Sequence, residues 1–130
     1  MDYETPESTP DVSLEFAHDT AASRLARRAI EPLLREDGQF AEDVSLAVSE
    51  IVTNVVEHTP DGGKLTAWDR DPLTLEVEDF GGGDPATPLV PADVGGHGVA
   101  IISRIADHWG VRKTRMGKVV WAMFGRPRHQ

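Results

Sequence analysis

The chain has 130 residues, which suffice for one compact domain but not for two of ordinary size, so a single site is expected. Its formal net charge of −9 argues against a nucleic-acid surface, because such surfaces cluster lysine and arginine to neutralise phosphates. Cysteine is absent, which excludes disulfides, thiolate nucleophiles and zinc–thiolate sites, and the five histidines are scattered rather than set at metal-ligand spacings. With neither a signal-peptide pattern nor an apolar anchor in its first residues, the sequence predicts a soluble, cytoplasmic protein without membrane contact.

The first third of the chain is predicted to contain a tail, a strand and a helix. Residues 1–11 are acidic and proline-bearing with little apolar mass, so they are expected to be disordered. Val12–Phe16 alternates apolar and polar residues, as a half-buried strand does. From Ala21 to Leu34 apolar residues recur at helical spacing, and Pro32 predicts a kink or restart near Glu31. The arginines of this helix are either solvated or form a basic face for an acidic partner protein.

A central helix is expected after Gly38, and its stretch Asp43–His58 organises the rest of the chain. Valines and isoleucines fall on one side of it and form a stripe wide enough to bury. Glu50 and Asn54 are four residues apart in a polar row on the other side. A lone pair with this spacing is usually the wet face of an amphipathic helix, but two glycine clusters downstream favour a functional role.

The remainder of the chain is predicted to form two hairpins and a short helix. In order, these are strands at 64–68 and 73–77, a loop at 84–94, a helix at 98–106, strands at 109–113 and 119–124, and a basic tail at 126–130. The loop holds three prolines between the glycine clusters, which makes it a candidate lid. Paired strands separated from helices predict an α+β fold over residues 12–125. The expected architecture is a two-layer sandwich of a mixed, mostly antiparallel sheet with helices on one face.

Asp79 is a candidate ligand-binding residue because it ends a strand and precedes Phe80 and three glycines. An ionised carboxylate only accepts hydrogen bonds, so it suits an exocyclic amine such as that of adenine. Glycines beyond it allow a planar ring or a ribose to approach the backbone. The alternative is an ordinary turn after a strand, since aspartate and glycine are common there.

Three further features suit polyphosphate chemistry. The segment Gly95-Gly96-His97-Gly98 opens the short helix with no capping side chain beside it, so its free amides form an anion site, unless the glycines only serve a loop that needs positive φ. Asn54 offers an amide oxygen to Mg²⁺, which takes few protein oxygens when it also binds phosphates. Glu50, one turn earlier, is placed to accept a proton from an attacking hydroxyl or water.

These segments together resemble the Bergerat-fold (GHKL) ATP-binding superfamily, and most of all the anti-sigma-factor serine/threonine kinases of partner-switching systems. Residues 50–58 (EIVTNVVEH) resemble the N-box, 78–83 (EDFGGG) the adenine-contacting G1 box and 96–99 (GHGV) the G2 box. Residues 107–111 and 117–121 resemble the last hairpin of that family. The resemblance extends over residues 12–124.

The resemblance implies roles for individual residues. Asn54 would carry Mg²⁺, Glu50 would be the catalytic base and Asp79 would contact adenine. The remaining ATP-lining positions would be Gly81, Gly83, Gly96, His97 and Gly98. His97 departs from the family, which often has another basic or a small residue there.

The resemblance also implies partners. Such a kinase phosphorylates a serine or threonine of a small STAS-domain antagonist, sequesters a sigma factor when that antagonist is unavailable, and is commonly a homodimer. Arg27 is similar to an arginine used for partner contact. No direct nucleic-acid contact is expected.

Four other interpretations compete with the kinase. The first is a nucleotide-gated binding module that captures a partner without catalysis. A histidine-kinase catalytic domain is less favoured, because no helical hairpin with a phospho-acceptor histidine precedes Val12, and a clamp ATPase lacks its transducer domain. The last is a two-layer domain with incidental glycines.

Overall fold

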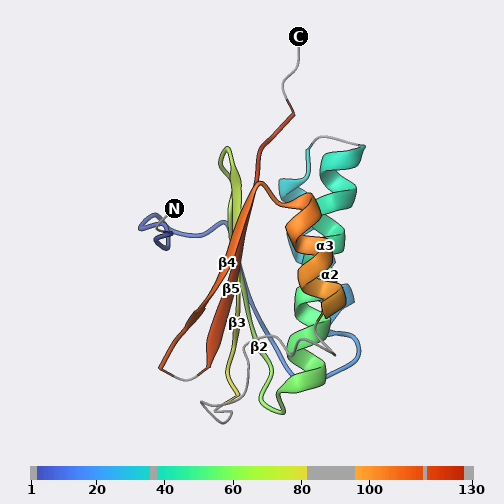
Figure 1. Cartoon of the computed structure of the whole chain (residues 1–130), viewed down its shortest axis with the longest axis vertical. Coiled ribbons are helices and arrows are strands. Elements are labelled where there is room, and N and C mark those ends of the chain that lie inside the picture. The colour runs from blue at the N-terminus through green and yellow to red at the C-terminus, as the bar shows by residue number, and fades with distance from the viewer. Residues whose placement is uncertain (1–2, 36–37, 82–95, 116, 128–130) are drawn as a thin grey trace.

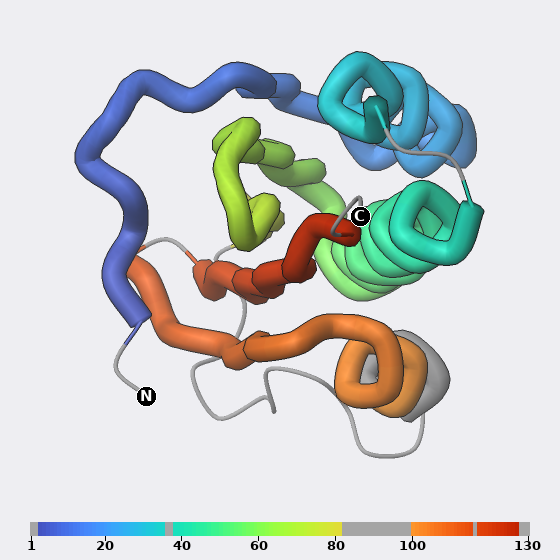
Figure 2. Tube along the Cα trace, turned by 90° about the horizontal axis from the view of Figure 1, so that it is seen from above, coloured from blue at the N-terminus to red at the C-terminus, as the bar shows by residue number. Residues whose placement is uncertain are grey.

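The computed structural model describes residues 3–35, 38–81, 96–115 and 117–127, and the side chains of all of these except residues 96–99. The elements, in chain order, are β1 (Val12–Phe16), α1 (Ala22–Ile30), the 3₁₀ turn η1 (Glu31–Leu33), α2 (Gln39–His58), β2 (Gly63–Trp68), β3 (Leu73–Asp79), α3 (Gly96–Ile105), β4 (His108–Lys113) and β5 (Lys118–Phe124). Figure 1 shows the sheet nearly edge-on with the helices on one side of it, and Figure 2 shows α1, α2 and α3 side by side in that order. The structure confirms the predicted two-layer α+β sandwich.

The five described strands form one sheet in the order β1-β2-β3-β5-β4. Each neighbouring pair is antiparallel, so the expected mixed sheet is antiparallel throughout its described strands. The central strand β3 pairs with β2 and β5, and this register sets Asp79 opposite both Gly63 and Lys118. The end of β3 is therefore held from both sides.

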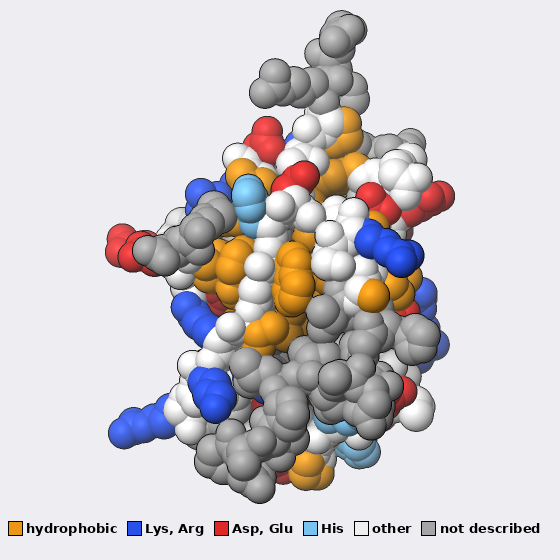
Figure 3. Space-filling model, in the orientation of Figure 1, with side chains coloured by type: hydrophobic (Ala, Val, Ile, Leu, Met, Phe, Trp, Pro, Cys, Tyr) orange, Lys and Arg blue, Asp and Glu red, His pale blue; other side chains and the backbone are white. Residues whose placement is uncertain are grey.

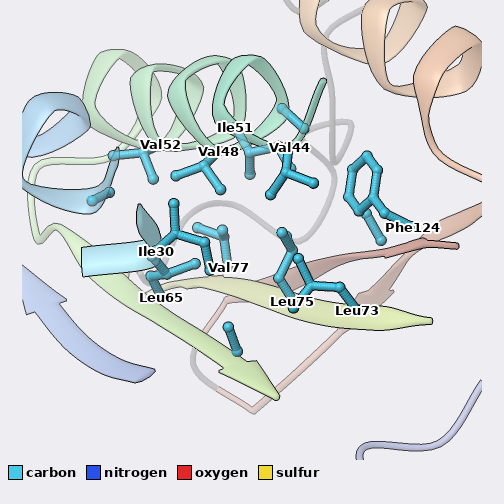
Figure 4. Packing of buried hydrophobic residues seen from close by; sticks show 14 of the residues in the cluster. Ile30, Val44, Val48, Ile51, Val52, Leu65, Leu73, Leu75, Val77 and Phe124 are labelled. Carbon is cyan, nitrogen blue, oxygen red and sulfur yellow. The ribbon is translucent and has the colours of Figure 1, made fainter. Parts of the chain in front are cut away.

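The core lies between α2 and the sheet. Gly38 has a φ of 88°, a backbone conformation that suits glycine, and α2 begins directly after it, as expected. The stripe predicted for this helix is buried and faces apolar side chains of the strands (Figure 4). Its members and their facing partners are Val44, Val48, Ile51, Val52, Val55, Leu65, Leu73, Leu75, Val77 and Phe124.

The expected interruption of the first helix is present. Helix α1 ends at Ile30, and the 3₁₀ turn that follows contains Pro32. Proline has no backbone N–H to continue the helical hydrogen bonds, so the chain tightens into the 3₁₀ turn, although Glu31 before it keeps helical φ and ψ. Leu33 of this turn is nevertheless buried in the core.

The prediction that residues 1–11 are disordered differs from the structure, which places residues 3–11 against the helix-free face of the sheet. The ring of Tyr3 stacks on Trp121, and the Trp68 indole donates a hydrogen bond of 3.0 Å to the Ser8 carbonyl. The Asp11 amide donates to the Ala67 carbonyl at 2.9 Å. The segment lacks apolar mass of its own, but two tryptophans of the sheet supply the surface on which it packs.

The basic tail begins with a residue that is fixed rather than free. The Arg126 guanidinium donates hydrogen bonds to Asp69 at 2.6 Å and to the Leu33 carbonyl at 3.2 Å. Its backbone amide donates to Asp71 at 3.0 Å, and the guanidinium lies over the ring of Phe40. Arg126 therefore joins the turn after β2 to the helix layer.

Two surface findings concern the described part of the chain. Every helix in it is too short or too polar to span a bilayer. On the face drawn in Figure 3, lysine and arginine side chains lie singly or in small groups, without a continuous basic patch among the described residues.

Candidate functional site

Glu50 and Asn54 lie on the same side of α2, as their spacing predicts. Both are half-buried, whereas Glu57, in the same polar row, is exposed. Their sequence neighbours Ile51 and Val55 belong to the buried stripe, so the two polar side chains border the core. The row is therefore not a uniformly solvated helix face.

Asp79 is the second polar feature, and it is almost completely buried. Its exposed fraction is 2%, and it shares the helix-facing side of β3 with Leu75 and Val77 because side chains alternate along a strand. Oδ1 has no hydrogen-bond partner among the described residues, and Oδ2 lies 3.9 Å from the Lys118 ammonium. An unpartnered buried polar group costs about 1–3 kcal/mol, so this oxygen is poorly explained by structural needs alone.

The electrostatic environment of Asp79 contains opposing influences. Burial raises the pKa of its carboxyl above the ordinary value, because the charged form loses hydration. The Lys118 ammonium and a hydrogen bond from the Gly81 amide both act to lower this pKa. The neighbouring Glu78 raises it, and the net shift is upward.

Thr59 connects the end of β3 to the end of α2. A Cβ atom on Gly81 would lie 2.7 Å from the Thr59 Cβ, so only glycine fits there without movement of Thr59. The Thr59 hydroxyl donates to the Val55 carbonyl at 3.0 Å, and the Thr59 carbonyl lies 2.9 Å from the His18 Nδ1. Figure 1 shows the ends of α2 and β3 at the same end of the molecule. Gly81, two residues after Asp79, is thus packed against the end of the helix that carries Glu50 and Asn54.

Several predicted site residues lie partly or wholly outside what the structure describes. Helix α3 begins at Gly96, so Gly96, His97 and Gly98 do form its first turn, and α3 packs beside α2 (Figure 2). The side chain of His97, and Gly83 with the candidate lid at 84–94, lie outside what the structure describes.

Arg27 is separate from the other predicted site residues. It is exposed on α1, which lies beside α2 on the side away from α3 (Figure 2). The structure therefore does not bring it together with them.

Residues 16–124 match the family described as the histidine kinase-like ATPase domain. The match extends over most of the chain. The chain belongs to this family. None of the curated proteins compared with the chain matches it. A histidine kinase-like ATPase domain is an ATP-binding domain, and the predicted nucleotide is therefore supported at this level.

The described residues of this histidine kinase-like ATPase domain fit a purine nucleotide. The unpartnered Oδ1 of Asp79 is an acceptor that an exocyclic amine would satisfy. For a metal, no group of three or more histidine, aspartate or glutamate side chains in the described segments could hold an ion. A Mg²⁺ ion shared between the Asn54 amide oxygen and phosphate oxygens would not require such a cluster.

Sequence reasoning missed three residues of this site: Thr59, Gly117 and Lys118. A Cβ atom on Gly117 would overlap the Asp79 carboxylate, and Lys118 is the cross-strand partner of Asp79. These residues are far from Asp79 in sequence, and only the antiparallel pairing of β3 with β5 and the packing of α2 bring them to it. A sequence signal for Lys118 would have required the strand register.

Proposed function

We propose that this protein is an ATP- and Mg²⁺-dependent serine/threonine protein kinase of the cytoplasm that also acts as an anti-sigma factor. The observation that carries the proposal is the combination of half-buried Glu50 and Asn54 on α2 with the buried, unpartnered oxygen of Asp79. A site that only bound nucleotide would need Asp79 and the glycines. A carboxylate beside the metal-binding amide is the additional group that phosphoryl transfer uses.

Each residue has one task in this proposal. Asp79 accepts a hydrogen bond from the adenine amine, and Gly81 lets the segment after Asp79 pack closely on Thr59. Asn54 contributes an amide oxygen to Mg²⁺. Bound ATP supplies the γ-phosphoryl group. Glu50 accepts the proton of the substrate hydroxyl as that oxygen bonds to phosphorus and the bond from phosphorus to the departing ADP breaks.

The proposed partners follow from the resemblance of residues 50–58, 78–83 and 96–99 to anti-sigma-factor kinases. The substrate would be a serine or threonine of a STAS-domain antagonist, and the sequestered partner would be a sigma factor. Helix α1 offers a surface for such contacts, because Arg24, Arg27 and Arg28 are exposed and Leu25 is 46% exposed. A homodimer is the expected assembly.

The test is phosphate transfer from γ-labelled ATP to a purified STAS-domain protein encoded in the same genome. Glu50→Gln should abolish transfer while ATP binding persists, because the amide cannot take the proton. Glu57→Gln is the matched control, since Glu57 belongs to the same helix row but is exposed. Unchanged transfer in Glu50→Gln would refute the base assignment.

A second outcome would separate the kinase from a nucleotide-gated binding module. If ATP binds and a sigma factor is retained, but no phosphate reaches any STAS-domain protein, catalysis is refuted. Equal retention by Glu50→Gln would then favour the binding module.

A further inference from the structure

Lys118 lies next to the buried carboxylate of Asp79. The two residues are cross-strand partners in β3 and β5, and both point to the helix-facing side of the sheet. The Lys118 ammonium is 3.9 Å from Asp79 Oδ2, and its side chain is only 21% exposed. The charge is therefore held close to Asp79 rather than freely solvated.

The turn before β5 fixes this position. The Gly117 amide donates to the Thr114 hydroxyl at 3.0 Å, and the Thr114 amide donates to the Gly117 carbonyl at 2.9 Å. Gly117 itself packs so closely on Asp79 that a Cβ atom there would overlap the carboxylate. This tight turn brings the first residue of β5 directly across from Asp79.

The protonation state of Asp79 decides which base it can accept. An ionised carboxylate is only an acceptor, whereas a protonated one also donates. Adenine presents an exocyclic amine where guanine presents a carbonyl oxygen. The ionised form therefore pairs with adenine and repels guanine, and the protonated form removes that repulsion by donating to the guanine oxygen.

We propose that Lys118 is a specificity-determining residue that keeps Asp79 ionised, so that the site accepts adenine nucleotides and rejects guanine nucleotides. This inference rests on the nucleotide binding proposed above and deepens it. Lys118 acts through Asp79 and is a positioning residue rather than a catalytic one.

The charges around Asp79 support this role. Burial and the neighbouring Glu78 favour the protonated form and raise the pKa of Asp79, while Lys118 and the Gly81 amide oppose them. Lys118 is the cation that acts on Asp79 within the described residues. Without Lys118, the hydrogen bond from the Gly81 amide would still favour the ionised form of Asp79. Burial and the charge of Glu78 would favour the protonated form.

The experiment is calorimetric titration of ADP and GDP between pH 5.5 and pH 8.5 into the full chain and its variants Lys118→Met and Lys118→Arg. The wild type should prefer ADP across the range. In Lys118→Met the pKa of Asp79 should rise further, so the ADP-over-GDP affinity ratio should fall about tenfold at the acid end and recover as the pH rises. Lys118→Arg should restore the wild-type profile, because it restores the cation.

The controls separate this role from a structural one. Asp79→Asn should give a ratio that does not change with pH, because it has no proton to exchange. A loss of folding in Lys118→Met would lower both affinities at every pH, and circular dichroism would detect it. A ratio in Lys118→Met that equals the wild-type ratio at every pH would overturn the inference while leaving nucleotide binding intact. A wild type that binds neither nucleotide would refute the proposed function, and this inference with it.

Discussion

The phenol ring of Tyr3 lies flat on the indole of Trp121, with ring centroids 4.2 Å apart and planes inclined by 6°. The Tyr3 hydroxyl donates a hydrogen bond of 2.5 Å to Glu76, whose carboxylate also accepts one from Thr5 at 2.6 Å. Beneath the indole, a Cβ atom on Gly110 would come within 2.6 Å of the ring. Trp121 is therefore enclosed between the sheet backbone and the N-terminal segment. This segment covers Trp121 on the helix-free face of the sheet.

Removing the Tyr3 side chain should destabilise the fold. Tyr3→Ala loses both the ring stack and the hydrogen bond to Glu76, and we expect the free energy of unfolding to fall by about 1–3 kcal/mol. Tyr3→Phe keeps the ring and should lose only about 1 kcal/mol. Urea unfolding monitored by tryptophan fluorescence measures both. Equal effects of the two variants would show that the stack contributes nothing.

Replacing the buried carboxylate of Asp79 should stabilise the protein in the absence of nucleotide. Burial raises the pKa of Asp79 in the folded state, so protonation favours folding. The stabilisation that comes from protonation of Asp79 is fully present below the pKa that Asp79 has in the unfolded state. It is lost as the pH rises through the pKa that Asp79 has in the folded state. Asp79→Asn should therefore be more stable than the wild type at pH 7 by about 1 kcal/mol, with the difference shrinking towards pH 4.

Urea unfolding of both proteins at the two pH values tests this expectation. A variant less stable than the wild type at pH 7 would show that the attraction between Asp79 and Lys118 outweighs the cost of burial. The same variant should bind ADP more weakly, as expected where a site is optimised for ligand binding rather than stability.

Gly117→Ala should impair nucleotide binding through Asp79. The added methyl would overlap the Asp79 carboxylate and must displace it, whereas Arg115→Ala in the same turn changes an exposed side chain. We expect the ADP affinity of Gly117→Ala to fall at least about tenfold, the equivalent of one lost hydrogen bond to a charged group. Titration of both variants measures the contrast. Wild-type affinity in Gly117→Ala would contradict the placement of Asp79 in the site.

Two arginines that bind the same carboxylate should differ in their effect on stability. Arg126 and Arg35 each lie 2.6 Å from a carboxylate oxygen of Asp69, but their side chains are 9% and 58% exposed. Arg35→Ala should cost less than about 1 kcal/mol, as exposed ion pairs do. Arg126→Ala should cost about 2–3 kcal/mol, because it removes hydrogen bonds to the partly buried Leu33 carbonyl and Asp69 carboxylate together with the contact on the Phe40 ring. Thermal or urea unfolding compares them, and equal losses would contradict the conclusion that Arg126 joins the turn after β2 to the helix layer.

The helices and strands and their order could be predicted from the sequence because apolar residues recur within each element at the spacing typical of a helix or a strand. The buried stripe of α2, the interruption at Pro32 and the two hairpins all follow from patterns within a few turns or residues. The shared side of Glu50 and Asn54 likewise follows from their spacing. Their partial burial does not, since it depends on what packs beside α2.

Contacts between distant segments were the part that the sequence could not supply. The position of residues 3–11 depends on Trp68 and Trp121, which belong to strands that face them only after folding. The pairing of Asp79 with Lys118 depends on strand register, and the fit of Gly81 against Thr59 depends on how α2 ends. The roles of Gly83, His97 and the loop at 84–94 stay predictions.

The most direct test of the account is calorimetric titration of ATP into the wild type and Asn54→Ala, with and without Mg²⁺. If Asn54 and Asp79 serve one Mg·ATP site, the wild type should bind ATP more tightly with Mg²⁺, and Asn54→Ala should lose this dependence while it still binds the base. Absence of ATP binding by the wild type, or an unchanged Mg²⁺ dependence in Asn54→Ala, would contradict the account.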